Sequence, residues 1–379
     1  MKNCLKYFLF YAVLPAWLAL PSLAYALAPQ ADGAVKTGAA VNYFEADELT
    51  RVLDRIERSS EVMIYRIQLA ASESAFGLPT RADNVKLALG SESGNIAVLY
   101  PELGEPYRGI FAKIIEGIEA QIGARVASYA VGGTLKEPDV LANLKRQDIK
   151  VVIALGRQGM KAASSLEREF GVVVGGVVSA PGDEVRNFSV ISLAPDPGML
   201  FERLKHFMPG ARRIIVVYEP RQNAWLIRLA RDAARKYGLE LQAIEAPDLK
   251  TAVRIYREQL ASADPRKDAL WLPQDSTTVE DTSVLPLVLE EAWNRNLAVF
   301  SSSVTHVKRG ALFSLYPNNV ALGRQLAASA LNYPAGNPGA STVVPLKDAL
   351  LAVNVRTASH LGLRLSPLQQ GFDLVFPAQ

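Results

Sequence analysis

Residues 214–246, IIVVYEPRQNAWLIRLARDAARKYGLELQAIEA, contain the pattern that decides the fold. Residues 214–218 form a short apolar run that predicts a buried strand, and residues 224–237 have the apolar spacing of an amphipathic helix, which Gly238 ends. Residues 241–246 predict a second strand. A helix of this length between two short strands predicts a βαβ unit, in which the two strands are parallel.

The same alternation continues in both directions from this unit. Further strands are expected at residues 96–100, 127–131, 151–155, 172–178, 189–193, 268–272, 297–301, 311–316 and 350–355. Further helices are expected at residues 106–122, 158–170, 197–208, 249–260, 284–294 (interrupted early by Pro286) and 320–332, with a short last helix that ends at Gly362. These strands are too many for one sheet. We therefore predict an α/β protein of two doubly wound parallel-sheet lobes, with the change of lobe near Asp196 and Pro197.

Composition and charge exclude some classes of protein. The chain has 379 residues, of which 49% are hydrophobic and 21% charged, as in ordinary globular proteins that bury a sizeable core. Lys and Arg number 41 against 38 Asp and Glu, and the two signs are interleaved along the chain. We therefore expect no nucleic-acid partner.

The first 26 residues predict a secretory signal peptide. Lys2 and Lys6 precede or flank the apolar residues 7–20, and Ala24-Tyr25-Ala26 is a small-x-small cleavage site. A membrane anchor is the alternative, but the apolar run is short for a spanning helix. We expect cleavage after about Ala26 and a periplasmic protein. The chain's single cysteine, Cys4, lies in this segment, which leaves no disulfide and no thiolate metal site.

The sequence contains few signatures of catalysis. It has no dinucleotide-binding or phosphate-binding glycine motif, no nucleophile elbow and no H-E-x-x-H motif. Its histidines, His206, His306 and His360, are too far apart in sequence to have the spacing of a helical metal site, and we expect His306 on the surface although it follows a strand. We expect no cofactor, no metal and no enzyme activity. An enzyme that uses scattered Asp and Ser residues is the alternative.

Loops at the carboxyl ends of the expected strands carry the candidate ligand-binding residues, because ligands of open α/β sheets bind there. These candidates are Tyr107, Gly156, Arg157, Gln158, Ala180, Tyr218, Asn223, Asp275, Ser276, Ser302 and Ser303. Hydroxyl groups and glycines with few acid/base pairs favour recognition of a small polar ligand over proton transfer. Asp275 is the best-placed acid for an ammonium group, although it is equally suited to cap a helix. Tyr107 could line an apolar part of the site or pack on a helix.

Several stretches resemble one known family, the ABC-type substrate-binding proteins related to tryptophan- and tyrosine-binding proteins. The similar stretches are residues 268–279 (DALWLPQDSTTV), 301–303, 309–311, 316–325 and 354–363. The resemblance implies a type I periplasmic-binding-protein fold, in which two lobes joined by three crossovers close on a ligand in the cleft between them. It also implies that Asp275 and Ser276 hold an amino group and that the permease of an ABC importer is a partner. Arg157 stands where the family often has a small pair of residues, and it could pair with an acidic ligand or close the cleft.

These expectations combine into one prediction. The expected domains are the signal peptide at 1–26, a partly helical extension at 27–91, a first lobe at 92–194 plus about 318–335, and a second lobe at 195–317 plus about 336–379. The expected function is that of a monomeric periplasmic protein that captures an amino acid or related small polar compound for an ABC importer. A periplasmic sensor or scaffold without transport is the alternative, which the extension favours.

Overall fold

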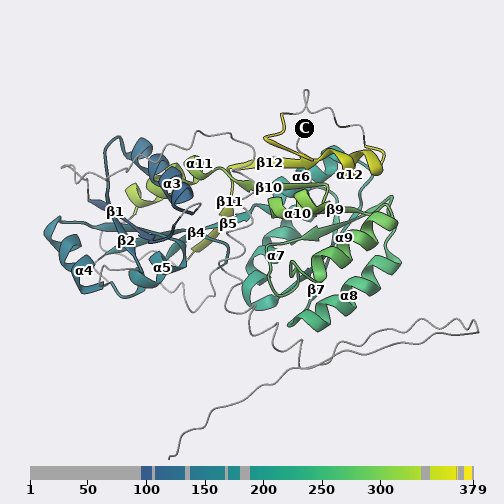
Figure 1. Cartoon of the computed structure of the whole chain (residues 1–379), viewed down its shortest axis with the longest axis horizontal. Helices are drawn as coiled ribbons and strands as arrows, with labels where there is room; N and C mark the ends of the chain where they lie inside the picture. Colours follow the sequence, from purple (N-terminus) through teal and green to yellow (C-terminus); the bar gives the residue numbers. More distant parts are fainter. Residues whose placement is uncertain are drawn as a thin grey trace, which may run out of the picture. The chain divides into compact units, whose positions relative to one another are not determined.

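The computed structural model describes residues 95–104, 107–132, 137–166, 170–179, 188–333, 342–363, 365 and 371–377. Figure 1 gives the arrangement of the elements within this part of the chain. The predicted signal peptide, the N-terminal extension, Pro106 and Ala180 lie outside the described residues. Among the helices described, none combines the length and the apolar character needed to cross a membrane.

The first sheet has six strands, all parallel, in the order β11-β5-β4-β3-β1-β2. The strands are β1 (Ile96–Pro101), β2 (Ala127–Val131), β3 (Val151–Leu155), β4 (Gly171–Val177), β5 (Ser189–Pro195) and β11 (Thr342–Leu346). The helices are α3 (Tyr107–Ile122), α4 (Glu137–Arg146), α5 (Gly156–Ser164) and α11 (Asn319–Leu331). Apolar residues of α3 and α11 share one core cluster, and those of α4 and α5 contribute to others. We call this sheet with its helices the first lobe.

The second sheet has seven strands in the order β13-β12-β10-β9-β8-β6-β7, and only the β10–β12 pair is antiparallel. The strands are β6 (Arg213–Tyr218), β7 (Glu240–Glu245), β8 (Asp268–Leu272), β9 (Ala298–Ser301), β10 (Phe313–Pro317), β12 (Ala349–Asn354) and β13 (Leu374–Phe376). The helices are α6 (Pro197–Phe207), α7 (Pro220–Lys236), α8 (Leu249–Ser262), α9 (Val284–Asn294), α10 (Val304–Arg309) and α12 (Val355–His360). Helices α6 and α7 share one core cluster and α8, α9 and α10 another. This is the second lobe.

The chain passes from one sheet to the other three times. It does so at Asp196 between β5 and α6, at Asn318 between β10 and α11, and at residues 347–348 between β11 and β12. Hydrogen bonds between the crossing segments tie them together, from Asp196 N to Leu346 O (2.9 Å) and from Asn318 N to Asp348 O (3.4 Å). Since β5 and β10 both end at a crossing, each sheet has its carboxyl edge on the side where the two lobes are joined.

Some expected elements differ from those observed. Helix α5 begins directly after β3 at Gly156 and ends at Ser164, earlier than expected. Pro286 does not interrupt α9, because it is the third helical residue, where the missing N–H would have no partner inside the helix. Helices α4 and α10 and strands β11 and β13 were not expected. Strand β11 pairs with β5, so residues 342–346 lie in the first sheet and not with the second lobe as expected.

Candidate functional site

Asp275 is a buried hydrogen-bond acceptor at the carboxyl edge of the second sheet. It follows β8, is 3% exposed, and accepts four hydrogen bonds. Its Oδ2 accepts from Glu219 N (2.7 Å) and Asn223 Nδ2 (3.0 Å), and its Oδ1 from Thr277 N (3.0 Å) and Thr278 N (3.1 Å). Burial raises the pKa of Asp275, and these hydrogen bonds oppose the rise. All the usual acceptor positions of the carboxylate are therefore used within the protein.

Glu219 connects this loop to helix α7. Its carboxylate oxygens accept hydrogen bonds from Arg221 N (3.0 Å) and Gln222 N (2.9 Å), which makes Glu219 the N-cap of α7. Gln222 in turn accepts a hydrogen bond at Oε1 from Ser179 Oγ (3.3 Å). Ser179 follows β4 of the first sheet, so this bond joins a loop of the first lobe to the first turn of α7 in the second lobe.

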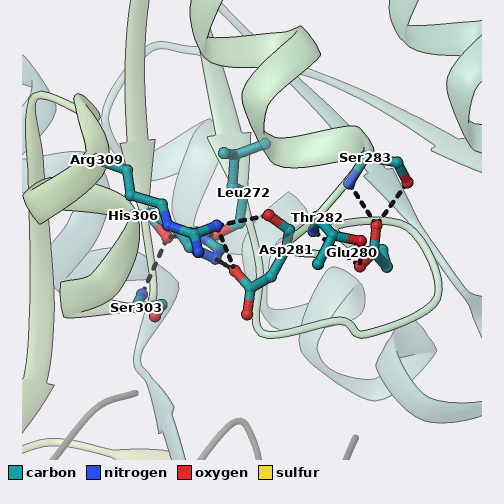
Figure 2. A network of polar contacts seen from close by, with 9 residues as sticks. Leu272, Glu280, Asp281, Thr282, Ser283, Ser303, His306 and Arg309 are labelled. Atoms are coloured by element: carbon teal, nitrogen blue, oxygen red, sulfur yellow. Dashed lines mark hydrogen bonds and ion pairs between the residues drawn. The ribbon is translucent and has the colours of Figure 1, made fainter. Parts of the chain in front are cut away.

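Three serines, Ser301 at the end of β9 and Ser302 and Ser303 after it, lie next to buried groups. Figure 2 shows Ser303 near His306. The Ser301 hydroxyl accepts a hydrogen bond from Ser303 N (3.0 Å), donates to Leu272 O (3.1 Å) and lies 2.7 Å from His306 Nδ1. Ser302 Oγ accepts from Trp271 Nε1 (3.1 Å). Because Ser301 and Ser302 are fully buried, Ser303 is the serine of this group with some residual exposure.

His306 is buried at 6% exposure, so the expectation of a surface histidine was wrong. Burial lowers its pKa to about 3, and the nearby Arg309 cation adds to this effect. The imidazole is therefore neutral near pH 7. Its Nε2 lies 3.9 Å from Asp281 Oδ1, and Arg309 Nη1 donates to the carbonyl oxygen (2.5 Å) and to Oδ1 (3.4 Å) of Asp281. Burial raises the pKa of Asp281, whereas Arg309 opposes the rise.

Ser301, His306 and Asp281 have the residue types of a catalytic triad, but their geometry serves a structural role. The Ser301 oxygen is fully buried and already hydrogen-bonded to Leu272 and to Ser303 N. The His306–Asp281 distance of 3.9 Å is too long for a direct hydrogen bond. A nucleophile must reach a substrate atom, and this hydroxyl is shielded from one. Ser301 and His306 thus support the serine loop, and Asp281 pairs with Arg309.

Glu280 caps the turn before α9 in the same part of the lobe. Its carboxylate accepts from the backbone N–H and the hydroxyl of Thr282 (2.8 and 2.5 Å) and from those of Ser283 (2.7 and 2.5 Å), as Figure 2 shows. Burial alone would raise the pKa of Glu280, but the hydrogen bonds from Ser283 and Thr282 lower it. No sequence motif had pointed to Glu280 as a functional candidate.

Closely packed glycines shape the carboxyl edge of the first sheet. Gly156 starts α5 with φ +67°, and Gly176 at the end of β4 has φ +71°. A Cβ atom on Gly176 would lie 3.2 Å from Gly156 N, and one on Gly132, after β2, would lie 2.6 Å from Gln158 Oε1. The predicted candidates Gly156, Arg157 and Gln158 thus lie in one tightly packed region, with Arg157 half-buried and Gln158 exposed.

Other predicted residues lie in the core or serve the loops. Tyr107 is 8% exposed and packs in the core of the first lobe, as expected of a helix-packing residue. Tyr218 packs in the core of the second lobe, and its hydroxyl donates to Glu245 Oε1 (2.9 Å). Both placements favour packing over ligand contact. Asn223 binds Asp275, and Ser276 is half-buried.

Gln274 is a residue that sequence reasoning missed. It lies between Pro273 and Asp275 in the loop after β8 and is 7% exposed. Within the part of the chain that the structure describes, neither its Oε1 nor its Nε2 has a hydrogen-bond partner. One signal could have identified Gln274: it lies in a loop after a strand, directly before Asp275 in the sequence. Within the described residues, no group of three or more His, Cys, Asp or Glu side chains could hold a metal ion.

Comparisons with known proteins agree with this architecture. Residues 140–367 match the family model described as ABC transporter substrate binding protein. The ligand-free, open structure of a substrate-binding protein with adhesive properties from Clostridium difficile is 16% identical, with a TM-score of 0.53 over 75% of this chain and 99% of that chain. No curated protein matches the chain.

Two further solved structures are similar over about the same span. An ABC domain in complex with L-Trp from Streptococcus pneumoniae is 17% identical, with a TM-score of 0.46 over 74% of this chain and 99% of that chain. A conserved domain protein from Vibrio cholerae is 19% identical, with a TM-score of 0.45 over 74% of this chain and 98% of that chain.

Proposed function

The chain belongs to the family of ABC transporter substrate-binding proteins, with the fold of type I periplasmic binding proteins, and from this we infer that it captures a small polar solute. Capture occurs between the carboxyl edges of the two sheets, and closure of the lobes excludes water from the solute. The protein then delivers the solute to the permease of an ABC importer. We place it in the periplasm as a monomer.

The observation that carries this proposal is the hydrogen bond between Ser179 of the first lobe and Gln222 of the second. It brings together the loop after β4 and the N-terminal turn of α7, which lie at the carboxyl edges of the two sheets, where ligands of α/β proteins bind. We propose that Arg157 and Gln158 from the first lobe and Ser276 and Ser303 from the second contact the solute. Asp275 acts as a positioning residue, because its carboxylate is used by the protein itself.

Solute binding in this proposal makes and breaks no covalent bond. The test is native mass spectrometry of the protein purified from cells, followed by denaturation and identification of the released molecule. We expect one small molecule per chain, recovered chemically unchanged. Recovery of a converted product would contradict the binding role and support an enzyme. Uptake of the identified solute in a strain that lacks the protein then separates import from a sensor or scaffold role.

A second measurement tests closure. Small-angle X-ray scattering of the full chain, with and without the identified solute, should give a smaller radius of gyration for the bound protein. An unchanged radius together with stoichiometric binding would contradict lobe closure while leaving solute binding intact.

A further inference from the structure

The amide of Gln274 is buried at the carboxyl edge of the second sheet with neither end paired. Its exposed fraction is 7%, and both Oε1 and Nε2 lack a hydrogen-bond partner among the described residues. Buried polar side chains of folded proteins nearly always have partners, so an amide with two unpaired ends calls for a specific explanation. A molecule bound at this edge, where ligands of open α/β sheets bind, would supply both partners.

The charged groups beside Gln274 are already engaged. Asp275 accepts four hydrogen bonds from Glu219 N, Asn223, Thr277 and Thr278. Each carboxylate oxygen of Glu219 accepts a backbone N–H of α7. An ammonium group placed next to Gln274 would therefore compete with the protein's own donors for the Asp275 carboxylate. The edge favours a neutral hydrogen-bonding group at this position.

We propose that Gln274 binds a carboxamide of the solute through a pair of hydrogen bonds. Nε2 donates to the carbonyl oxygen of the solute, and Oε1 accepts from its N–H. A carboxylate at this position would leave Oε1 without a donor, and an amine would leave Nε2 without an acceptor. This inference rests on the proposed solute-binding function and narrows it to amide-bearing solutes.

The test compares amides with their matching acids on the full chain, stripped of bound solute by unfolding and refolding. The pairs are L-asparagine with L-aspartate, L-glutamine with L-glutamate, and nicotinamide with nicotinate. The variants are Gln274→Met, which keeps the length and removes the amide, and Gln259→Met on α8 as a control away from the edge. Thermal shifts give binding, and titration calorimetry gives the affinity.

We expect at least one amide to raise the melting temperature of the wild type while its acid does not. Gln274→Met should weaken binding of that amide at least tenfold, whereas Gln259→Met should leave the affinity unchanged. The solute-free Gln274→Met protein should melt at the same temperature as the wild type or above it, because an unpaired buried amide has been removed.

Three results would overturn the inference. Equal binding of an amide and its acid would show that the carboxamide is not recognised. Unchanged affinity in Gln274→Met, with a lower melting temperature, would show that the amide is paired inside the protein or by water. No response to any of the six compounds would contradict the solute class, and solute binding itself would still be decided by native mass spectrometry.

Discussion

The two lobes form their carboxyl edges by different means. In the first lobe, glycines allow close packing: Gly176 lies against the backbone of Gly156, and Gly132 lies against the side chain of Gln158. In the second lobe, buried polar side chains hold the loops in place, with Asp275 and Ser301 each hydrogen-bonded to several groups. The first edge therefore depends on the absence of side chains and the second on their presence.

This difference predicts where each lobe is sensitive to substitution. An added methyl group should disturb the first lobe, where backbone contacts leave no space for it. A lost acceptor should disturb the second lobe, where several buried donors depend on one carboxylate. The predictions below test this division from the largest effect to the smallest.

Replacement of Asp275 by Ala should have the largest effect on stability. It leaves Glu219 N, Thr277 N, Thr278 N and the Asn223 amide without their acceptor, which should cost about 4 kcal/mol of unfolding free energy. Urea denaturation measures the loss.

The matched control is Asp248→Ala. Asp248 is an exposed N-cap of α8 that accepts from Thr251 N and Oγ1 (2.7 and 3.0 Å), so its loss should cost much less. Equal losses of unfolding free energy in the two variants would show that the hydrogen bonds of Asp275 stabilise the protein no more than an ordinary helix cap does.

Replacement of Gly323 by Ala should destabilise the first lobe. Gly323 lies where α11 packs against α3, and a Cβ atom there would be 2.0 Å from Ile114 O. The helices must separate, and the strain should outweigh the better helix propensity of Ala by about 2 kcal/mol.

Thermal denaturation measures this change, with Gly104→Ala as the control. Gly104 is exposed and has no atom within 4 Å of an added Cβ, so its substitution should be nearly neutral. A Gly323→Ala protein as stable as the control would refute the dependence of the first lobe on close backbone contact.

His306 should make the stability of the second lobe depend on pH. Its pKa is lowered to about 3 in the folded protein by burial, while an unfolded histidine titrates near 6.5. Below pH 6.5 the unfolded state takes up a proton that the folded state does not, so stability falls as the pH drops towards 3. Between pH 6 and pH 5, the wild type should lose about 1 kcal/mol more than His306→Asn.

Urea denaturation at several pH values compares His306→Asn with His206→Asn, which alters an exposed histidine of α6. Parallel profiles for wild type and His306→Asn would mean that the imidazole has nearly the same pKa in the folded and the unfolded state, which would contradict the prediction.

The regular part of the fold could be predicted from local pattern alone. The buried strands β3, β6 and β8 are short apolar runs, and Asp196 caps α6 by accepting from Gly198 N (2.8 Å), as its position before Pro197 suggests. Helix α4 was not predicted, because its sequence, EPDVLANLKR, has too few apolar residues to show helical periodicity. Strand β11 was not predicted, because it forms by pairing with β5, which lies about 150 residues away along the chain.

The sequence predicted which loops form the candidate site, but not which side chains in them are free to bind a ligand. The strand-end rule located the loops that contain Asp275 and the serines. The role of Asp275 is decided by its partners. These are Glu219 and Asn223, which lie 56 and 52 residues away from it in the sequence. Likewise, no local pattern indicates that His306 is buried or that Gln274 lacks partners, because both depend on how distant segments pack.

The smallest effect is expected where the two lobes meet. Ser179→Ala removes the hydrogen bond to Gln222, a neutral contact of 3.3 Å, and should weaken solute affinity only about threefold. Titration calorimetry with the solute found by native mass spectrometry measures this loss, and Ser262→Ala, which alters an exposed serine of α8, is the control.

A double-mutant cycle with Gln222→Ala measures the coupling energy between Ser179 and Gln222 in solute binding. If the bond helps to hold the lobes together around the solute, the double variant binds no more weakly than either single variant. Additive losses would mean that Ser179 and Gln222 act on the solute separately, so that the two edges are coupled by the solute itself.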